Sequence, residues 1–369
     1  MKIAYVYDAV YPFVKGGVEK RVYEIGRRLA RKHEVHWFSL NWDGELDDIL
    51  VHRVGNWKRF YHGDRRSIGE ALYFAQKLLL KFGGEYDIVD CQEFPYFSCF
   101  STKLHSILKR TPLVLTWHEV WDGHWYEYLG KLGGIGRRVE RLTTRLTPHN
   151  IAVSRFTQKR LLRFGVPSRV IPNGIDFEKI RSVPRLEGVD YDVLFVGRLI
   201  REKNVELLVR AVQILKTEIP DIKVLIIGDG PERRRLERLS EELNLVENVD
   251  FKGFLDEYEA VISHMKASRV FVLPSIREGF GITALEANAS GIPVVTVVHP
   301  LNAAAELIVH EYNGFLAFPN PGSLAESILV ALDHGKKLKR NCVRYARNYD
   351  WDNITRLIEN FYERVADDS

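Results

Sequence analysis

The sequence predicts an α/β protein made of two doubly wound, Rossmann-like domains that face each other across a cleft. Short β-branched or aromatic runs alternate with amphipathic helical patterns almost throughout, and this alternation starts again after residue 185. Strands that are apolar on both faces and alternate with helices are typical of parallel sheets covered by helices. The length of 369 residues exceeds a single common core and fits two domains of roughly 150–200 residues each.

The first series opens with a strand, a helix and a strand, which read KIAYVYD, VEKRVYEIGRRLARK and HEVHWFSL. Later strands of the same sheet are YDIVDCQ, TPLVLTWHE and HNIAVS. The second series contains the strands YDVLFVGRL, KVLIIGDG, NVDFKG and RVFVLPS, separated by the helices NVELLVRAVQILKTE, PERRRLERLSEELN and YEAVISHMKAS. We therefore expect a first domain over 1–174, a linker over 175–190, a second domain over 191–346 and a final helix over 347–369 that crosses back to the first domain.

Composition indicates a water-soluble globular protein, with 46% apolar and 28% charged residues. No apolar run approaches the roughly 20 residues that span a bilayer. The opening MKIAYVYDAV lacks the marks of a signal peptide, so a cytoplasmic location is expected. The three cysteines are odd in number and form no CxxC pair, which favours small buried side chains over disulfides or a zinc site. Few Met, Cys and Gln residues beside many charges are typical of a thermophile.

Charge divides unevenly along the chain. Residues 1–185 contain 31 Lys and Arg against 20 Asp and Glu, whereas residues 186–369 contain 22 against 29. A basic half joined to an acidic half predicts that the halves meet different partners. For the basic half, nucleic acid, a phosphorylated acceptor and an anionic membrane surface all fit, and the last of these would place the protein peripherally on the inner face of the membrane.

Several motifs follow strands of the first domain, where ligands of parallel sheets bind. Gly16 and Gly17 precede a helix and suit either close approach to an anion or a plain tight turn. His118 ends a strand and could contact a sugar hydroxyl, although a structural histidine is the commoner case. Next come an aromatic patch and an arginine stripe, which suit sugar, lipid or simple packing and solvation: Trp121, Trp125, Tyr126 and Tyr128, then Arg137, Arg141 and Arg145.

In the second domain, Arg198 and Lys203 lie between a strand and a helix that Asn204 would cap. Two cations beside a helix N-terminus suit a diphosphate, because both favour negative charge. Gly228 belongs to GDGPER, which resembles part of a dinucleotide fingerprint, but Arg233 stands where the third glycine would be. The Asp-x-Asp pairs at 190–192 and 350–352 lie at the starts of elements and are interpreted as structural. No other metal-ligand spacing is present, so we expect no metal and no cofactor.

The segment SIREGFGITALEANASGIPVV carries the most specific pattern. A strand ends at Pro274, Glu278 follows in a loop, and a helix begins near Ile282. The N–H groups of Phe280, Gly281 and Ile282 then lack helical partners and can bind an anion. Glu278 and Glu286 flank this opening as acceptor-only groups that suit paired sugar hydroxyls. The pattern indicates a nucleotide-sugar site.

With these residues, the sequence resembles the retaining family 4 glycosyltransferases of the GT-B fold (glycosyl transferases group 1). The resemblance covers essentially the whole chain and is strongest over residues 170–320. The matching stretches are KGGVEK, TWHE, VSRFT, IPNGID, FVGRLIREKN, GDGPE, REGFGITALEANASGIPVV and EYNGFLAFP. The chain departs from the family pattern at Glu119, where members often have Asp, and at LNAAAE, where relatives carry glycine.

The resemblance implies transfer of a hexose from a UDP- or GDP-sugar to an acceptor sugar or a lipid-linked acceptor. It implies front-face attack with retained anomeric configuration and without an obligatory metal. Glu278 would hold the donor sugar and Glu286 the ribose, while Arg198 and Lys203 would hold the diphosphate. His118 would lie near the anomeric carbon, and Gly16 and Gly17 would approach the phosphate or the acceptor.

Three rival functions remain at this stage. An epimerase of the same fold would act on the donor without an acceptor. A dehydrogenase would use GDGPER to bind NAD. An RNA-binding protein would use the basic half, but the sequence lacks an aromatic-rich RNA motif and its charges are spread over several helices, so no nucleic acid partner is expected.

Overall fold

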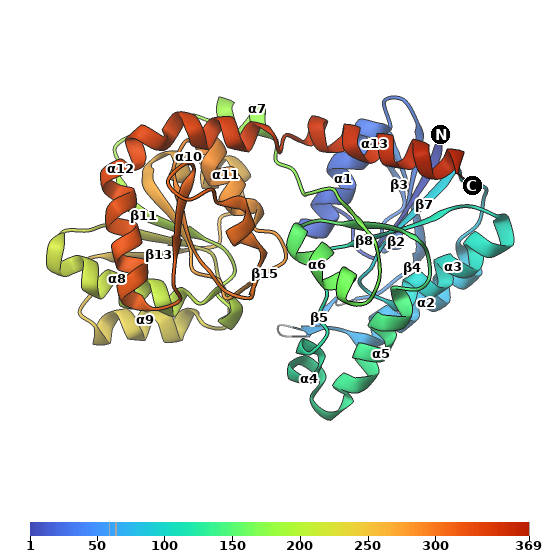
Figure 1. Cartoon of the computed structure of the whole chain (residues 1–369), viewed down its shortest axis with the longest axis horizontal. Coiled ribbons are helices and arrows are strands. Elements are labelled where there is room, and N and C mark those ends of the chain that lie inside the picture. The colour runs from blue at the N-terminus through green and yellow to red at the C-terminus, as the bar shows by residue number, and fades with distance from the viewer. Residues whose placement is uncertain (59, 63–64, 369) are drawn as a thin grey trace. The chain divides into compact units, whose positions relative to one another are not determined.

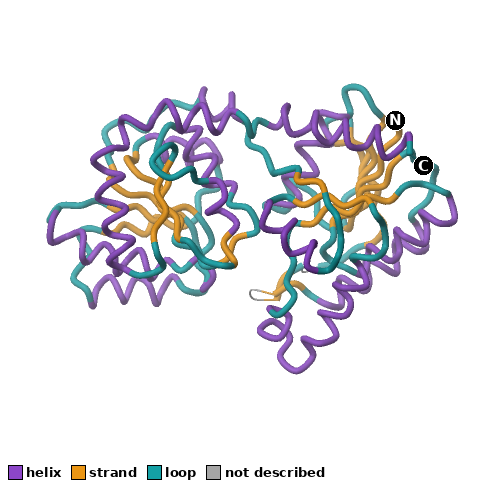
Figure 2. The backbone as a smooth tube through the Cα atoms, in the orientation of Figure 1, coloured by secondary structure: helices purple, strands orange, loops and turns teal. Residues whose placement is uncertain are grey.

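The computed structural model describes residues 1–58, 60–62 and 65–368. It contains two compact units, one formed by residues 1–173 with 351–369 and the other by residues 174–350. In each unit the strands lie inside and helices cover both faces of the sheet (Figures 1 and 2). The α/β class and the two Rossmann-like, doubly wound sheets are as the sequence predicted.

The first unit is built on an eight-stranded sheet in the order β10-β9-β8-β7-β1-β2-β4-β3. Neighbouring strands are parallel except β3 and β4. The strands are β1 (Lys2–Val6), β2 (Glu34–Leu40), β3 (Gly44–Leu46), β4 (Ile49–Gly55), β7 (Ile88–Gln92), β8 (Leu113–Trp117), β9 (His149–Ala152) and β10 (Arg169–Val170), with a separate antiparallel pair β5 (Tyr61–His62) and β6 (Arg65–Arg66). The strand order reverses at β1, so the loop after this strand lies where parallel sheets open a crevice for ligands.

The first unit also contains helical segments. They are α1 (Gly17–Leu29), α2 (Ile68–Lys81), α3 (Phe97–Lys109), α4 (His124–Leu129), the 3₁₀ turn η1 (Gly130–Leu132), α5 (Gly133–Thr143), α6 (Arg155–Arg163) and α13 (Trp351–Asp367). The last of these packs against the first unit, because Trp351 and Tyr362 are fully buried there and the Tyr362 hydroxyl donates to Asp90 at 2.6 Å.

The second unit has a six-stranded parallel sheet in the order β13-β12-β11-β14-β16-β18. Its strands are β11 (Tyr191–Val196), β12 (Val224–Ile227), β13 (Val249–Gly253), β14 (Ser268–Leu273), β16 (Val294–Val297) and β18 (Gly314–Ala317), and a short parallel pair joins β15 (Arg277–Glu278) to β17 (Leu301–Asn302). Its helical segments are α7 (Phe177–Ser182), η2 (Arg201–Lys203), α8 (Val205–Glu218), α9 (Arg233–Glu242), α10 (Tyr258–Lys266), α11 (Ile282–Ser290), η3 (Ala303–Leu307) and α12 (Pro321–Arg347).

Two boundaries differ from those expected. The segment expected as a linker, 175–190, belongs to the second unit and contains α7, because Phe177 and Ile180 give it a buried apolar face. The final helix expected over 347–369 is present as one helix, but it begins four residues later than expected. Buried Cys342 and Ala346 keep α12 on the second unit to Arg347, and α13 begins at Trp351.

Candidate functional site: the loops after the parallel strands

The segment between β14 and α11 contains the short strand β15 and a closely packed glycine. Glu278 was expected in a loop, but it lies in β15 and pairs with Asn302 of β17. Gly281 then adopts φ +95°, a conformation that other residues rarely take. A side-chain carbon at this position would lie 2.6 Å from the Cβ atom of Ala304. The glycine is therefore required both by its backbone conformation and by the close approach of η3.

The start of α11 leaves backbone donors open. The helix begins at Ile282, as predicted. Among the described residues, the N–H groups of Phe280, Gly281 and Ile282 have no hydrogen-bond acceptor. Three open N–H groups at the positive end of a helix attract an anionic group.

Glu278 and Lys203 come together although 75 positions separate them. Lys203 Nζ donates to Glu278 Oε1, and the same oxygen accepts from the Ser275 hydroxyl at 2.9 Å. Both charged side chains are mostly buried, with 21% and 11% of their areas exposed. The carboxylate is thus oriented by two donors on Oε1, and Oε2 has no partner among the described residues.

Arg198 lies in the loop after β11 and is exposed. Its side chain has no hydrogen bond or ion pair to any other described residue. The expected cap at Asn204 differs from the structure, because this residue has φ +50° and its side chain accepts no helical N–H. Instead η2 tightens the chain just before α8 and places Lys203 beside Glu278.

Gly228 lies in the loop after β12 and packs against the loop that carries Arg198. Its φ is +137°, and a side-chain carbon there would lie 1.9 Å from the Gly197 carbonyl oxygen. Its N–H donates to Gly253 O at 2.8 Å. A side-chain carbon at Gly230 would likewise lie 2.4 Å from the Leu199 carbonyl oxygen. Backbone therefore fills the space beside both glycines, so neither position accepts a side chain.

Glu286 lies in the fifth position of α11 and is 5% exposed. Its Oε1 atom accepts from the Tyr258 hydroxyl at 2.9 Å. Tyr258 begins α10, so a neighbouring helix fixes the orientation of the carboxylate. The sequence pattern found Glu286 but gave no signal for Tyr258, because the two residues belong to different helices.

In the first unit, Gly16 and Gly17 are exposed at the start of α1. Gly16 occupies the position before the helix with extended backbone. A side-chain carbon at Gly16 would meet the carboxylate of Glu19 at 2.6 Å. This contact is with a side chain rather than with backbone, so it leaves both the turn and the anion interpretation open.

His118 follows β8 and contacts Gln92, which ends the adjacent strand β7. The two atoms His118 Nε2 and Gln92 Oε1 are 2.8 Å apart. Burial, with the nearby Arg21 cation, lowers the pKa of His118 to about 3, so the ring is neutral at physiological pH. With the Gln92 oxygen accepting, Nε2 carries the proton and Nδ1 has a free lone pair. The ring is then suited to accept from a hydroxyl.

Glu93 lies next to Gln92 and was not identified from the sequence. It is buried, and its Oε1 atom accepts from the backbone N–H of Glu119 at 3.3 Å. Burial raises the pKa of Glu93 well above its usual value. The backbone N–H of His118 also bonds to this side chain, so Glu93 helps to fix the loop that carries the histidine.

The arginine stripe is only partly free to meet a ligand. Arg137 Nε donates to Asp122 at 2.6 Å, and Arg141 lies over the Phe164 ring at 5.3 Å. Arg145 was expected on the same helix, but α5 ends at Thr143. Two of the three arginines therefore have partners within the unit.

The Asp-x-Asp pairs have structural partners. Asp190 pairs with Arg185, Asp192 pairs with Arg269 at 2.7 Å, and Asp352 pairs with Arg28 at 2.6 Å. Asp350 accepts from the N–H of Phe177 at 3.1 Å. In the part of the chain that the structure describes, no three His, Cys, Asp or Glu side chains gather as a metal site, and no helix is long and apolar enough to cross a membrane.

Family models account for nearly all of this architecture. Residues 15–179 match the model described as Glycosyltransferase Family 4, and residues 176–349 match Glycosyl transferases group 1. The chain belongs to the family 4 glycosyltransferases. It is therefore a glycosyltransferase of the GT-B fold, as the sequence resemblance implied.

Curated relatives of this glycosyltransferase agree with that assignment. An uncharacterized glycosyltransferase of Methanocaldococcus jannaschii is 29% identical, and the match covers 98% of both chains. A phosphatidyl-myo-inositol mannosyltransferase of Mycobacterium leprae is 30% identical over 58% of this chain and 59% of its own length. A GDP-mannose-dependent phosphatidylinositol dimannoside mannosyltransferase of Mycobacterium tuberculosis is 29% identical over 53% of this chain and 51% of its own.

Solved structures share the fold. Sucrose-phosphate synthase from Thermosynechococcus elongatus is 22% identical with a TM-score of 0.79 over the whole of both chains. Anabaena HepE in complex with UDP-glucose is 20% identical with a TM-score of 0.75 over 99% of this chain and 100% of its own.

Proposed function

We propose that this glycosyltransferase moves a hexose from a UDP- or GDP-sugar to an acceptor hydroxyl, with retention of anomeric configuration and without a required metal. One observation carries the proposal: the ion pair of Lys203 and Glu278 lies within the loops that also hold the open N–H groups at the start of α11. Cations and N–H groups suit a diphosphate, while an oriented carboxylate suits sugar hydroxyls.

Each residue then has a defined role in the proposed reaction. The diphosphate binds Arg198, Lys203 and the N–H groups before α11, which stabilise the negative charge that develops as it leaves. Glu278 turns its Oε2 atom toward the donor sugar, and Glu286 binds the ribose hydroxyls. These fixed positive groups can supply the charge stabilisation that a metal ion supplies elsewhere, which supports the metal-independent form.

The acceptor attacks from the face that the diphosphate leaves, and a leaving oxygen takes the proton of the acceptor hydroxyl. His118 is neutral and offers Nδ1 as an acceptor, so it can orient a sugar hydroxyl but is poorly suited to donate a proton. Gly16 and Gly17 offer exposed backbone to the phosphate or the acceptor.

The experiment tests the donor site through two substitutions and a matched control. Glu278→Ala and Lys203→Ala should each lower kcat at least 100-fold, since a preorganised charge-stabilising group contributes roughly this much. Lys223→Ala removes an exposed cation of the same unit and should leave kcat unchanged. Near-full turnover of Glu278→Ala would contradict the site assignment.

The donor and the stereochemistry are measured separately. A thermal-shift screen with UDP-, GDP- and ADP-sugars and NAD should show protection by one nucleotide-sugar class and none by NAD. NMR of the product should show the anomeric configuration of the donor, and turnover should survive EDTA. An epimerised product from donor alone would favour the epimerase instead.

Relatives support a lipid-linked acceptor and peripheral attachment to an anionic membrane as the finer form of this proposal, because two of them are named for phosphatidylinositol substrates. Sedimentation with anionic liposomes tests it. Changing Arg137, Arg141 and Arg145 together to Glu should abolish co-sedimentation if the arginine stripe mediates attachment, and unchanged binding would exclude that role.

A further inference from the structure

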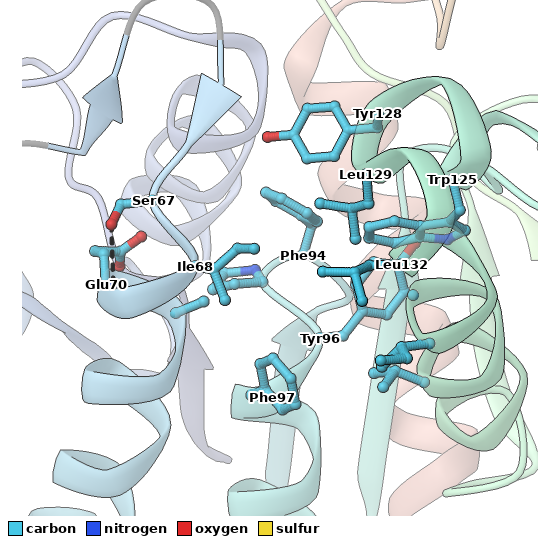
Figure 3. A pocket seen from close by; sticks show the side chains of 15 residues that line it. Ser67, Ile68, Glu70, Phe94, Tyr96, Phe97, Trp125, Tyr128, Leu129 and Leu132 are labelled. Carbon is cyan, nitrogen blue, oxygen red and sulfur yellow. Dashed lines mark hydrogen bonds between the residues drawn. The ribbon is translucent and has the colours of Figure 1, made fainter.

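An apolar cavity lies in the first unit between the N-terminal ends of α2 and α3 and the α4–α5 segment (Figure 3). Its volume is about 180 Å³. An engineered apolar cavity of about 150 Å³ in another protein holds benzene, so this volume is enough for a short length of hydrocarbon. Figure 3 shows Ile68 on one side and Leu129 and Leu132 on the other, with Phe94 between them.

The cavity has rigid walls. The Glu140 carboxylate of α5 accepts from the Tyr96 hydroxyl at 2.9 Å and from the backbone N–H groups of Trp121 and Asp122 at 2.6 and 2.8 Å. Gly136 lies so close to the Trp125 ring that a side-chain carbon there would be 2.3 Å from it. These contacts fix α5 against α4 and the start of α3, so the cavity is preformed rather than a gap that side chains can close.

The rim of the cavity exposes apolar side chains. Ile68, Leu132 and Ile135 are 52%, 60% and 58% exposed. Exposed aliphatic groups that surround an apolar opening are typical of a surface that is covered by an apolar partner. Hydrocarbon that entered the cavity would bury the rim as well as the lining.

Two cations lie close to rim residues along the chain. Lys131 directly precedes Leu132, and Arg138 lies one turn after Ile135 on α5. Both are exposed, and neither has an ion pair or hydrogen bond with another described residue. Unpaired cations beside an apolar opening complement a molecule with a hydrocarbon chain and an anionic head.

We propose that this cavity binds one hydrocarbon chain of a phosphate-bearing lipid that serves as acceptor, with Lys131 and Arg138 contacting its phosphate. The inference rests on the proposed glycosyl transfer, because it names the substrate class of that reaction. Burial of the hydrocarbon chain in the cavity holds the lipid. Contact of the two cations with the phosphate keeps the head group outside.

The test is calorimetric titration of the full chain with decyl phosphate below its critical micelle concentration. Leu132→Asp together with Ile135→Asp should weaken binding at least tenfold, and the exposure of both side chains keeps the fold intact. The matched control changes Leu80 and Leu108 to Asp, which are 73% and 72% exposed on α2 and α3 but do not line the cavity. The control should bind within twofold of the unmodified protein.

The head group is tested with decyl maltoside and inorganic phosphate. Lys131→Glu with Arg138→Glu should weaken decyl phosphate at least fivefold and leave decyl maltoside unchanged, and inorganic phosphate alone should bind far more weakly than decyl phosphate. Equal losses in the rim variant and its control would overturn the proposal, as would inorganic phosphate that binds as well as the lipid. A dimer that dissociates in the rim variant would assign the surface to a second copy of the chain instead.

Binding of UDP and GDP is measured on the same preparations. If the protein binds nucleotide but the rim variant binds decyl phosphate as tightly as the unmodified protein, the lipid site is refuted and the proposed transfer is not. Lipid binding without any nucleotide binding would refute the proposed transfer and leave the cavity as a lipid site.

Discussion

Alanine at position 228 tests how closely the loop after β12 must pass the loop that carries Arg198. Gly228 has φ +137°, and the Cβ atom of an alanine there would lie 1.9 Å from the Gly197 carbonyl oxygen. The neighbour is backbone, so it cannot rotate away as a side chain could. To reach an ordinary contact, the loop must move, and Arg198 directly follows the displaced residue.

The magnitude has two parts. A positive φ costs a non-glycine residue roughly 1–2 kcal/mol. Overpacking against a neighbour costs a further 1–3 kcal/mol or so. Gly188→Ala in the same unit gives the cost of a positive φ without a clash, because Gly188 has φ +73° and no atom within 4 Å of the added carbon. The difference between the two variants should thus be about 1–3 kcal/mol, or roughly 2–12 °C in the unfolding temperature of a unit of this size.

Differential scanning calorimetry measures the unfolding temperature, and titration with the best-protecting nucleotide measures affinity. We expect Gly228→Ala to unfold at a lower temperature than Gly188→Ala and to bind nucleotide at least tenfold more weakly. Equal unfolding temperatures of the two variants would refute the reasoning that backbone contact requires this glycine. Full nucleotide affinity in Gly228→Ala would show that this glycine does not determine the position of Arg198.

Three further predictions concern single side chains. The folded-state pKa of His118, about 3, lies below its unfolded value near 6.5, so this residue contributes stability above pH 6.5 that is lost on acidification. Unfolding in urea should show that His118→Gln removes up to about 2 kcal/mol of the fall in unfolding free energy between pH 7 and pH 5. An unchanged fall in the variant would contradict this. Tyr362→Phe deletes the 2.6 Å hydrogen bond to Asp90 and should lower the free energy of unfolding by about 1.5–3 kcal/mol in the same assay; a change under about 0.5 kcal/mol would show that the bond is unimportant. Tyr258→Phe removes the donor to Glu286 and should raise the nucleotide Kd a few-fold while kcat stays within twofold, and a large fall in kcat would give Tyr258 a different role.

The order of elements could be predicted from the sequence because it depends on local patterns. Apolar runs and helical periodicity predicted the strands and helices of both sheets, and the glycines before Ile282 predicted the start of α11. Glu278 and Glu286 were identified because they flank that helix start within one segment.

Local patterns could not predict contacts between segments that are distant in the chain. The partners Ser275 and Tyr258, the Gln92 contact of His118 and the buried Glu93 depend on which strand ends lie side by side. The short strand β15 formed where a loop was expected because β17 supplies its partner from 24 residues later.

The sequence by itself determined the α/β class, the two Rossmann-like sheets and the glycosyltransferase resemblance, because hydrophobic period, turn glycines and spaced carboxylates are all local properties. Only the tertiary structure decided that Lys203 orients Glu278, that backbone fills the space beside Gly228, and that α4, α5 and the starts of α2 and α3 enclose an apolar cavity. The physical reason is that these features arise from packing between segments far apart in the chain, where neither partner alone shows which atoms it will meet.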